Sequence, residues 1–141
     1  MTNGKLIYFA GSIRGGREDQ QLYLEIVDHL KAHGAVLTEH VGDHALTGEG
    51  EKLSSREIHD RDLAWLSKSD CIVAEVTMPS LGVGYEIGRA LEWKKPVLCL
   101  FRPAEGRLLS AMIAGNIEVT LREYCTIAEL KIHLDDFLSG L

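Results

Sequence analysis

The stretch Cys71-Ile72-Val73-Ala74-Glu75-Val76, followed by Ser80-Leu81-Gly82-Val83-Gly84 and then by Tyr85-Glu86, decides the fold. Its first part is an almost continuous apolar run, which is typical of a strand buried on both faces of a sheet. The glycines then predict a turn, and Tyr85-Glu86 the first turn of a helix. Such a helix start points backbone N–H groups and a positive dipole end at the edge of the sheet, so we predict an anion site there.

Glu86 is the candidate nucleophile at this site. In a first helical turn the dipole is expected to keep the carboxylate ionised. An ionised carboxylate beside an anion site suits attack on a sugar carbon. The same position is also explained if Glu86 only complements the helix dipole, and this stretch alone leaves both interpretations open.

A second glycine-rich loop follows an apolar run over 5–10, which predicts the first strand. The loop consists of Gly11, Ser12, Ile13, Arg14, Gly15, Gly16 and Arg17. Glycines let the backbone approach a phosphate, and an arginine binds two of its oxygens at once. Glycine-rich turns after strands also arise for geometric reasons alone, so the phosphate interpretation needs the partner loop at 80–84.

Strands alternate with helices along the rest of the chain. Apolar periodicity predicts helices over 18–33, 55–69, 108–113 and 127–138 beside the one carrying Glu86, and further strands over 35–38, 97–101 and 117–120. This order predicts a single α/β domain over 1–141, a doubly wound five-stranded parallel sheet of Rossmann or flavodoxin type with helices on both faces. Both glycine-rich loops then face each other at the carboxyl ends of strands, where such sheets bind ligands.

Two further residues are candidates from their position. His40 follows the second strand, near that same edge, although a lone histidine there is more often solvent-facing than part of a site. A glycine-rich stretch over 42–53 comes next, and we expect it to be a mobile loop. Asp62 lies in a predicted helix near Leu63 and Trp65. It is either a solvated surface acid or, if it faces the site, an acid whose pKa apolar neighbours raise until it donates a proton.

Composition excludes several function classes. The chain has 141 residues and a net charge of −6, and no run of Lys or Arg, which argues against binding a nucleic-acid polymer. The apolar runs are strand-sized, which argues against a membrane protein. The start has no signal-like segment, so we expect the cytosol, or the nucleus as well in a eukaryote. The three cysteines have no metal-ligand spacing, and we expect neither a metal nor a cofactor.

Several long motifs carry a family resemblance. They are Tyr8-Phe9 with Gly11 to Asp19, Leu37-Thr38-Glu39-His40-Val41, Ala74 to Glu86, and Leu100-Phe101-Arg102-Pro103 with Leu109 to Ile113. In this order they closely resemble the 2'-deoxynucleoside 5'-monophosphate N-glycosidases of the nucleoside 2-deoxyribosyltransferase-like superfamily. The resemblance covers residues 6 to about 115.

The resemblance implies a role for each site residue. Glu86 would be the nucleophile, Tyr8 its neighbour on the first strand, and Asp62 the acid that protonates the departing base; from the sequence alone, Tyr8 would be a core aromatic residue. The substrate contacts would be Gly11, Ser12, Ile13, Arg14, Gly15, Gly16, Arg17, His40, Ser80, Gly82, Ser110, Ala111 and Met112. Ser110 would come from the neighbouring subunit of a homodimer. The implied substrate is a nucleoside 5'-monophosphate.

Two other functions use the same residues. A transferase would pass the sugar to a second base instead of water, although a nucleoside substrate would not need the phosphate contacts. A nucleotide-binding sensor would need only the two loops. The segment 108–113 is unusually apolar, and we expect an interface there because a core helix does not explain Ser110 and Met112 in one turn.

Overall fold

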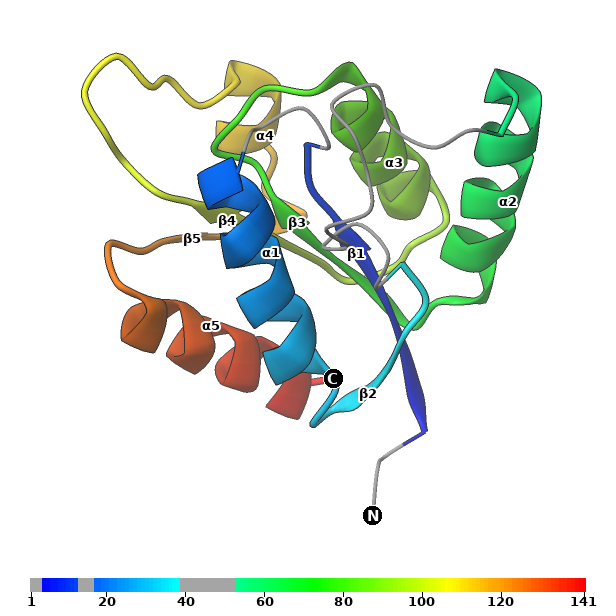
Figure 1. The fold of residues 1–141 in the computed structure, drawn as a ribbon, viewed down its shortest axis with the longest axis horizontal. Helices are drawn as coiled ribbons and strands as arrows, with labels where there is room; N and C mark the ends of the chain where they lie inside the picture. The colour runs from blue at the N-terminus through cyan, green and yellow to red at the C-terminus, as the bar shows by residue number, and fades with distance from the viewer. Residues whose placement is uncertain (1–3, 13–16, 39–52) are drawn as a thin grey trace.

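The computed structural model describes residues 4–12, 17–38 and 53–141 (Figure 1). Its strands are β1 (Lys5–Ala10), β2 (Gly34–Val36), β3 (Cys71–Glu75), β4 (Val97–Phe101) and β5 (Val119–Glu123). Its helices are α1 (Arg17–Leu30), α2 (Ser55–Lys68), α3 (Leu81–Glu92), α4 (Ala111–Ala114) and α5 (Ile127–Ser139). No helix in these ranges is long and apolar enough to cross a membrane.

The strands form one parallel sheet in the order β2-β1-β3-β4-β5. This is the doubly wound, flavodoxin-like order, and it confirms the predicted fold class. The winding changes direction between β1 and β3, which pair from Ile7 with Cys71 to Ala10 with Ala74. Both loops predicted to bind an anion leave the sheet at this switch point, from adjacent strands.

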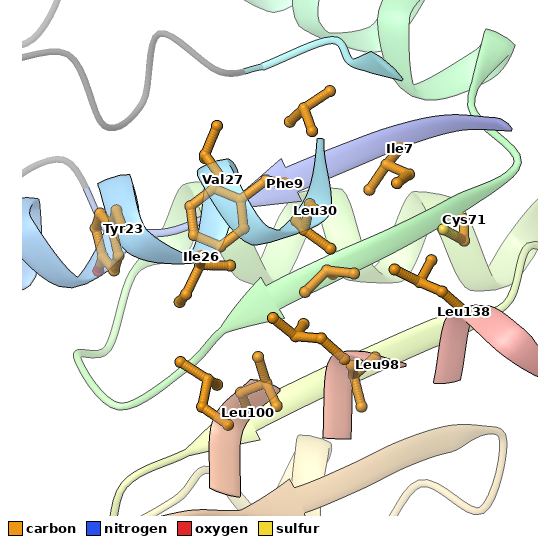
Figure 2. Packing of buried hydrophobic residues seen from close by; sticks show 14 of the residues in the cluster. Ile7, Phe9, Tyr23, Ile26, Val27, Leu30, Cys71, Leu98, Leu100 and Leu138 are labelled. Atoms are coloured by element: carbon orange, nitrogen blue, oxygen red, sulfur yellow. The ribbon is translucent and has the colours of Figure 1, made fainter. Parts of the chain in front are cut away.

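Two apolar layers cover the sheet. On one face, α1 and α5 lie side by side (Figure 1), and Figure 2 shows their side chains packed onto alternate strand residues such as Ile7, Phe9 and Leu98. On the other face, Tyr8, Ala10 and Ala74 pack with residues of α2 and α3. Because strand side chains alternate between faces, Tyr8 points toward α3, away from its neighbours Ile7 and Phe9.

The start of α3 differs from the prediction. Ser80 is its N-cap and accepts a hydrogen bond from Val83 N at 3.2 Å, so Gly82 and Gly84 lie inside the helix. The predicted turn over 80–84 and the helix start at Tyr85-Glu86 were therefore wrong, and Glu86 is the sixth residue of α3. The reason is visible in the packing, because Val83, Ile87 and Ala90 repeat at helical spacing against the sheet.

Three other bounds shift for local reasons. After Leu30 the chain tightens into turns with His33 N bonded to Leu30 O at 2.9 Å, so α1 stops before the predicted 33. The Ser110 hydroxyl accepts from Met112 N at 3.2 Å, which delays α4 from 108 to Ala111. Asn116 Oδ1 accepts from Glu118 N at 2.8 Å, and this turn delays β5 from 117 to Val119.

Candidate active site

A cavity of about 630 Å³ lies where β1 and β3 end, between α2 and the start of α3. Six of the predicted site residues line it: Gly11, Ser12, Asp62, Ser80, Gly82 and Glu86. They come from three parts of the chain: the loop after β1, helix α2, and α3 with its N-cap. The parallel sheet brings these parts together because the carboxyl ends of its strands lie along one edge. The cavity therefore combines two carboxylates with the two loop starts predicted to bind an anion.

Glu86 has a buried partner beneath the cavity. The Tyr8 side chain is fully buried, and its hydroxyl donates a hydrogen bond to Glu86 Oε2. Burial and the neighbouring Glu86 carboxylate hold the pKa of Tyr8 far above its usual value, so the phenol keeps its proton. Tyr8 thus fixes the direction of the Glu86 carboxyl group.

The electrostatics of Glu86 differ from the expectation. Burial raises the pKa of Glu86 to about 7, while the hydrogen bond from Tyr8 lowers it and the nearby Asp62 raises it further. The idea that the helix dipole keeps this carboxylate ionised was wrong, because Glu86 lies beyond the first turn of α3 and desolvation dominates. Glu86 therefore exchanges its proton near neutral pH.

Asp62 borders the same cavity from α2. Its side chain is 21% exposed, and its Oδ1 lies 2.8 Å from Arg61 Nη2 and 3.0 Å from Arg61 Nε. The Arg61 guanidinium in turn lies over the Trp65 ring, 4.6 Å from its centroid. Asp62 thus faces the cavity with a guanidinium bonded to it, whereas the sequence suggested Leu63 and Trp65 as the neighbours that matter.

The first loop is packed tightly where it leaves β1. A Cβ on Gly11 would lie 2.8 Å from Cζ of Tyr23, and the hydroxyl of Tyr23 accepts a hydrogen bond from Ser12 N at 3.0 Å. Gly11 is thus required by the close approach of Tyr23 whether or not a ligand binds. Ile13, Arg14, Gly15, Gly16 and His40, and the loop over 42–52, lie outside the described residues, as does the side chain of Arg17.

Ser110 and Met112 do not line the Glu86 cavity. They line a second cavity of about 600 Å³ that lies next to the first and shares Pro79, Ser80, Leu81 and Val83 with it. Ala111, the first residue of α4, is exposed. Within one chain, therefore, the structure does not bring these three predicted contacts to Glu86.

Three polar residues of the Glu86 cavity were not predicted from the sequence: Ser55, His59 and Tyr85. His59 Nε2 lies 2.9 Å from the Tyr85 hydroxyl, which also accepts from Arg89 Nη1 at 2.8 Å. A signal was present, because His59 precedes Asp62 by three residues and so shares its face of α2.

A buried polar network supports the loop after β3. The Glu75 carboxylate accepts from Thr77 N and Thr77 Oγ1, both at 2.8 Å, and from the Tyr124 hydroxyl. Arg102 N donates to Thr77 Oγ1 at 2.9 Å, which ties this loop to the end of β4. Burial raises the pKa of Glu75. The sequence analysis took Glu75 as part of a strand and assigned it no role.

Fold and cavity together define a ligand-binding protein of the doubly wound α/β class, with its site at the switch point. Residues 7–131 match the family model described as nucleoside 2-deoxyribosyltransferase, and the chain belongs to this family. The resemblance noted in the sequence is thereby confirmed at the level of the family.

Individual relatives are more than half identical to the chain. The chain is 55% identical over 139 residues to a 5-hydroxymethyl-dUMP N-hydrolase of Tetraodon nigroviridis, covering 95% of this chain and 97% of that one. It is 62% identical over 128 residues to the protein of the same name from Mus musculus, covering 89% and 74%. Among solved structures, the solution structure of BlsM matches with a TM-score of 0.75 at 23% identity, covering 99% and 93%, which shows a shared fold.

Proposed function

We propose that this protein hydrolyses the N-glycosidic bond of 2'-deoxynucleoside 5'-monophosphates, releasing the free base and deoxyribose 5-phosphate. The observation that carries the proposal is Glu86, held by the buried Tyr8 and sharing one cavity with Asp62 and with the start of α3. Relatives more than half identical to the chain are named N-hydrolases of a deoxynucleotide, which supports the same reaction.

The two carboxyl groups divide the chemistry. Breaking the bond between C1' and the base nitrogen sends the electron pair to the base and leaves positive charge on C1'. Glu86 in its ionised form bonds to C1' through Oε1, because Tyr8 holds Oε2. Asp62, protonated in the substrate complex, gives its proton to the departing nitrogen.

A water molecule completes the reaction. It attacks C1', its proton passes to the Asp62 carboxylate, and the bond between C1' and Glu86 breaks to release the sugar phosphate. Asp62 then carries the proton needed for the next turnover. No metal or cofactor takes part in this scheme. Because Arg61 Nε and Nη2 both contact Asp62 Oδ1 here, the proton for the acid step would be carried by Oδ2.

The phosphate would bind where the two loops meet. Ser80 is the N-cap of α3, and Gly82 in the first turn lines the cavity. The free N–H groups of this first turn therefore favour an anion at the cavity edge. Ser12 borders the same cavity from β1, and the sequence places Arg14 and Arg17 just after it. Binding the phosphate there would supply orientation energy that is used at C1'.

The proposed active unit is a homodimer in which Ser110 completes the partner's site. Leu81, Leu108 and Met112 are 97%, 88% and 82% exposed, and all three line the second cavity beside Ser110. Large apolar side chains gathered at one cavity are typical of a surface that binds another protein. Ser80 borders both cavities, so a second copy that covers this surface lies beside the Glu86 cavity, and we propose that its Ser110 reaches the phosphate there.

The test is to incubate the protein with 5-hydroxymethyl-dUMP and with the common deoxynucleoside monophosphates, and to measure the released base by chromatography. We expect base release from at least one nucleotide, and turnover lower by several orders of magnitude in Glu86→Gln, which keeps the shape and loses the nucleophile. The matching nucleoside without phosphate should be a far poorer substrate.

The same assay distinguishes the other functions. A transferase would convert an added second base into a new nucleotide, whereas the hydrolase releases sugar phosphate at the same rate with or without that base. A sensor would bind the nucleotide and leave it unchanged after prolonged incubation with equimolar protein. Either result would overturn the proposal, as would equal turnover of nucleoside and nucleotide.

A further inference from the structure

Two histidines and one aspartate converge on the side of the molecule covered by α1 and α5. His29 lies in the last turn of α1, His33 follows one turn later, and Asp135 lies in α5. The Nε2 atoms of both histidines lie 2.7 Å from the same oxygen, Asp135 Oδ1. Two nitrogens and a carboxylate oxygen are thus aimed at one point by residues more than 100 positions apart in the chain.

The geometry of this cluster is near that of a metal site. One ligand atom from each residue lies within 4.8 Å of the others, and the two imidazole centroids are 6.0 Å apart with the rings tilted by 59°. A tetrahedral Zn²⁺ takes nitrogen and oxygen ligands at about 2.0–2.2 Å, which places neighbouring ligand atoms about 3.3 Å apart. The two contacts to Oδ1 would need to lengthen by about 0.6 Å, which small side-chain rotations provide.

The cluster is accessible to an ion from solvent. The side chains of His29 and His33 are 23% and 22% exposed, and that of Asp135 is 50% exposed. Hydrogen bonds from His33 and His29 hold the pKa of Asp135 below its usual range, so the carboxylate is ionised at neutral pH. An open side leaves room for a water molecule as the fourth ligand, as in sites with three protein ligands.

The donor set selects the kind of ion. Two imidazoles with one carboxylate suit Zn²⁺ and similar first-row transition metals, whereas Mg²⁺ and Ca²⁺ prefer oxygen ligands alone. The i, i+4 spacing of His29 and His33 places both rings on one side of the helix end, the arrangement that helical zinc ligands use. On binding, each neutral ring carries its proton on Nδ1 so that Nε2 can bind the metal.

We propose that His29, His33 and Asp135 form a Zn²⁺ site that joins the end of α1 to α5. The site lies near the end of the sheet where the strands begin, and the Glu86 cavity lies at the end where they finish. This follows because α1 runs from the end of β1 back toward the start of β2 (Figure 1). The hydrogen bond of 2.7 Å from Lys5 Nζ to Leu138 O also places the end of α5 beside the start of β1. Because these three residues meet only in the folded chain, a metal bound there stabilises the fold by its binding free energy.

The test uses the full chain, freed of metal by a chelator and then titrated with Zn²⁺. Calorimetry should give one ion per chain, and the midpoint of thermal unfolding should rise by several degrees at saturating Zn²⁺. His29→Gln, His33→Gln and Asp135→Asn should each weaken binding at least about tenfold and abolish most of that rise. Each variant is compared with itself in the absence of Zn²⁺, so a general loss of stability does not imitate the effect.

His133→Gln is the matched control. His133 also lies in α5, two positions from Asp135, but its Nε2 lies 2.9 Å from the Glu123 carbonyl oxygen instead of in the cluster. This variant should bind Zn²⁺ as the unsubstituted protein does. The proposal is overturned if Zn²⁺ leaves the unfolding midpoint unchanged, if the three cluster variants bind as tightly as the control, or if the variants only lower stability in metal-free protein, which would show a hydrogen-bonded triad and no metal site.

Discussion

Burial and the hydrogen bond from Tyr8 shift the pKa of Glu86 in opposite directions. Its burial disfavours the ionised form that the proposed attack on C1' requires, while the hydrogen bond from Tyr8 favours it. Because burial raises the pKa of Glu86 to about 7, its carboxyl group changes between the protonated and the ionised form near neutral pH. The activity of the site therefore depends on a small set of contacts that each move this pKa in a known direction.

The first prediction at this scale concerns the pH profile. The kcat/KM for the nucleotide should fall on the acid side with a midpoint near pH 7, because protonated Glu86 cannot attack. Tyr8→Phe removes the contact that lowers the pKa of Glu86, so its midpoint should move to higher pH. In Asp62→Asn, whose residual activity is low, the midpoint should move to lower pH.

Tyr124→Phe serves as the control for the profile, since it removes a buried hydroxyl that is bonded to Glu75 and not to Glu86. Its acid midpoint should stay where it is in the unsubstituted protein. If Tyr8→Phe and Tyr124→Phe have the same midpoint, Tyr8 does not tune Glu86.

The second prediction concerns stability. The pKa of Glu86 is about 7 in the folded chain against its ordinary value of 4.5, so the unfolded chain loses this proton first as pH rises. The carboxyl group therefore destabilises the fold progressively between about pH 4.5 and pH 7, by about 3 kcal/mol in total. Glu86→Gln should remove this penalty and be more stable than the unsubstituted protein at pH 8, with little difference near pH 4. Denaturant unfolding at pH 4 and at pH 8 measures the free energy of unfolding of both proteins. A Glu86→Gln variant less stable than the unsubstituted protein at pH 8 would contradict the burial argument.

At the scale of elements, the predicted start of α3 was wrong because two glycines were taken as signs of a turn. Gly82 and Gly84 suggested a turn, but the spacing of Val83, Ile87 and Ala90 on the core face continues the helix back to Leu81. Ser80 supplied a recognisable N-cap signal at the correct place. The bounds of α4 and β5 depended on side-chain turns at Ser110 and Asn116, which apolar periodicity does not report.

Two glycines of α3, Gly82 and Gly88, differ in whether they border the Glu86 cavity. A Cβ on Gly82 would meet only Ser80 Oγ, at 3.8 Å, and a Cβ on Gly88 would meet nothing within 4 Å. The packing therefore tolerates alanine at both positions, and helix propensity favours it by up to about 1 kcal/mol. Of these two glycines, only Gly82 lines the Glu86 cavity.

We accordingly predict that Gly82→Ala and Gly88→Ala both leave the free energy of unfolding unchanged or slightly increased. Gly82→Ala should raise the KM for the nucleotide, because the added methyl group occupies the approach to the proposed phosphate site. Gly88→Ala, the matched control in the same helix, should not. Steady-state kinetics and denaturant unfolding on both variants test this, and equal KM values would remove Gly82 from the phosphate site.

For the whole molecule, the sequence was sufficient wherever topology alone places residues together. Alternating strands and helices led to one parallel sheet, and that sheet brought Gly11, Ser80 and Glu86 to one edge. It was not sufficient where packing between distant helices decides, as for His29 with Asp135. Nor did it indicate the contact within α2 that places Arg61 over Trp65. The role of Ser110 is a third kind of case, since it lines the neighbouring cavity and its proposed contact needs a second chain.

The last prediction tests that second chain. Glu86→Gln and Ser110→Phe should each be inactive, the first for lack of a nucleophile and the second because a bulky ring blocks the phosphate. If Ser110 acts across a two-fold interface, a mixed dimer has one site with both defects and one site with neither, so it should have about half the activity of an unsubstituted dimer. If Ser110 acts within its own chain, every site in the mixed dimer keeps one defect and activity stays absent.

Size-exclusion chromatography must show the dimer, and two differently tagged variants must co-purify to prove exchange. Ser110→Ala, which removes the hydroxyl without blocking the site, should raise KM while leaving kcat and dimer formation nearly unchanged. A fully active monomer, or no recovery in co-purified mixed dimers, would rule the shared site out.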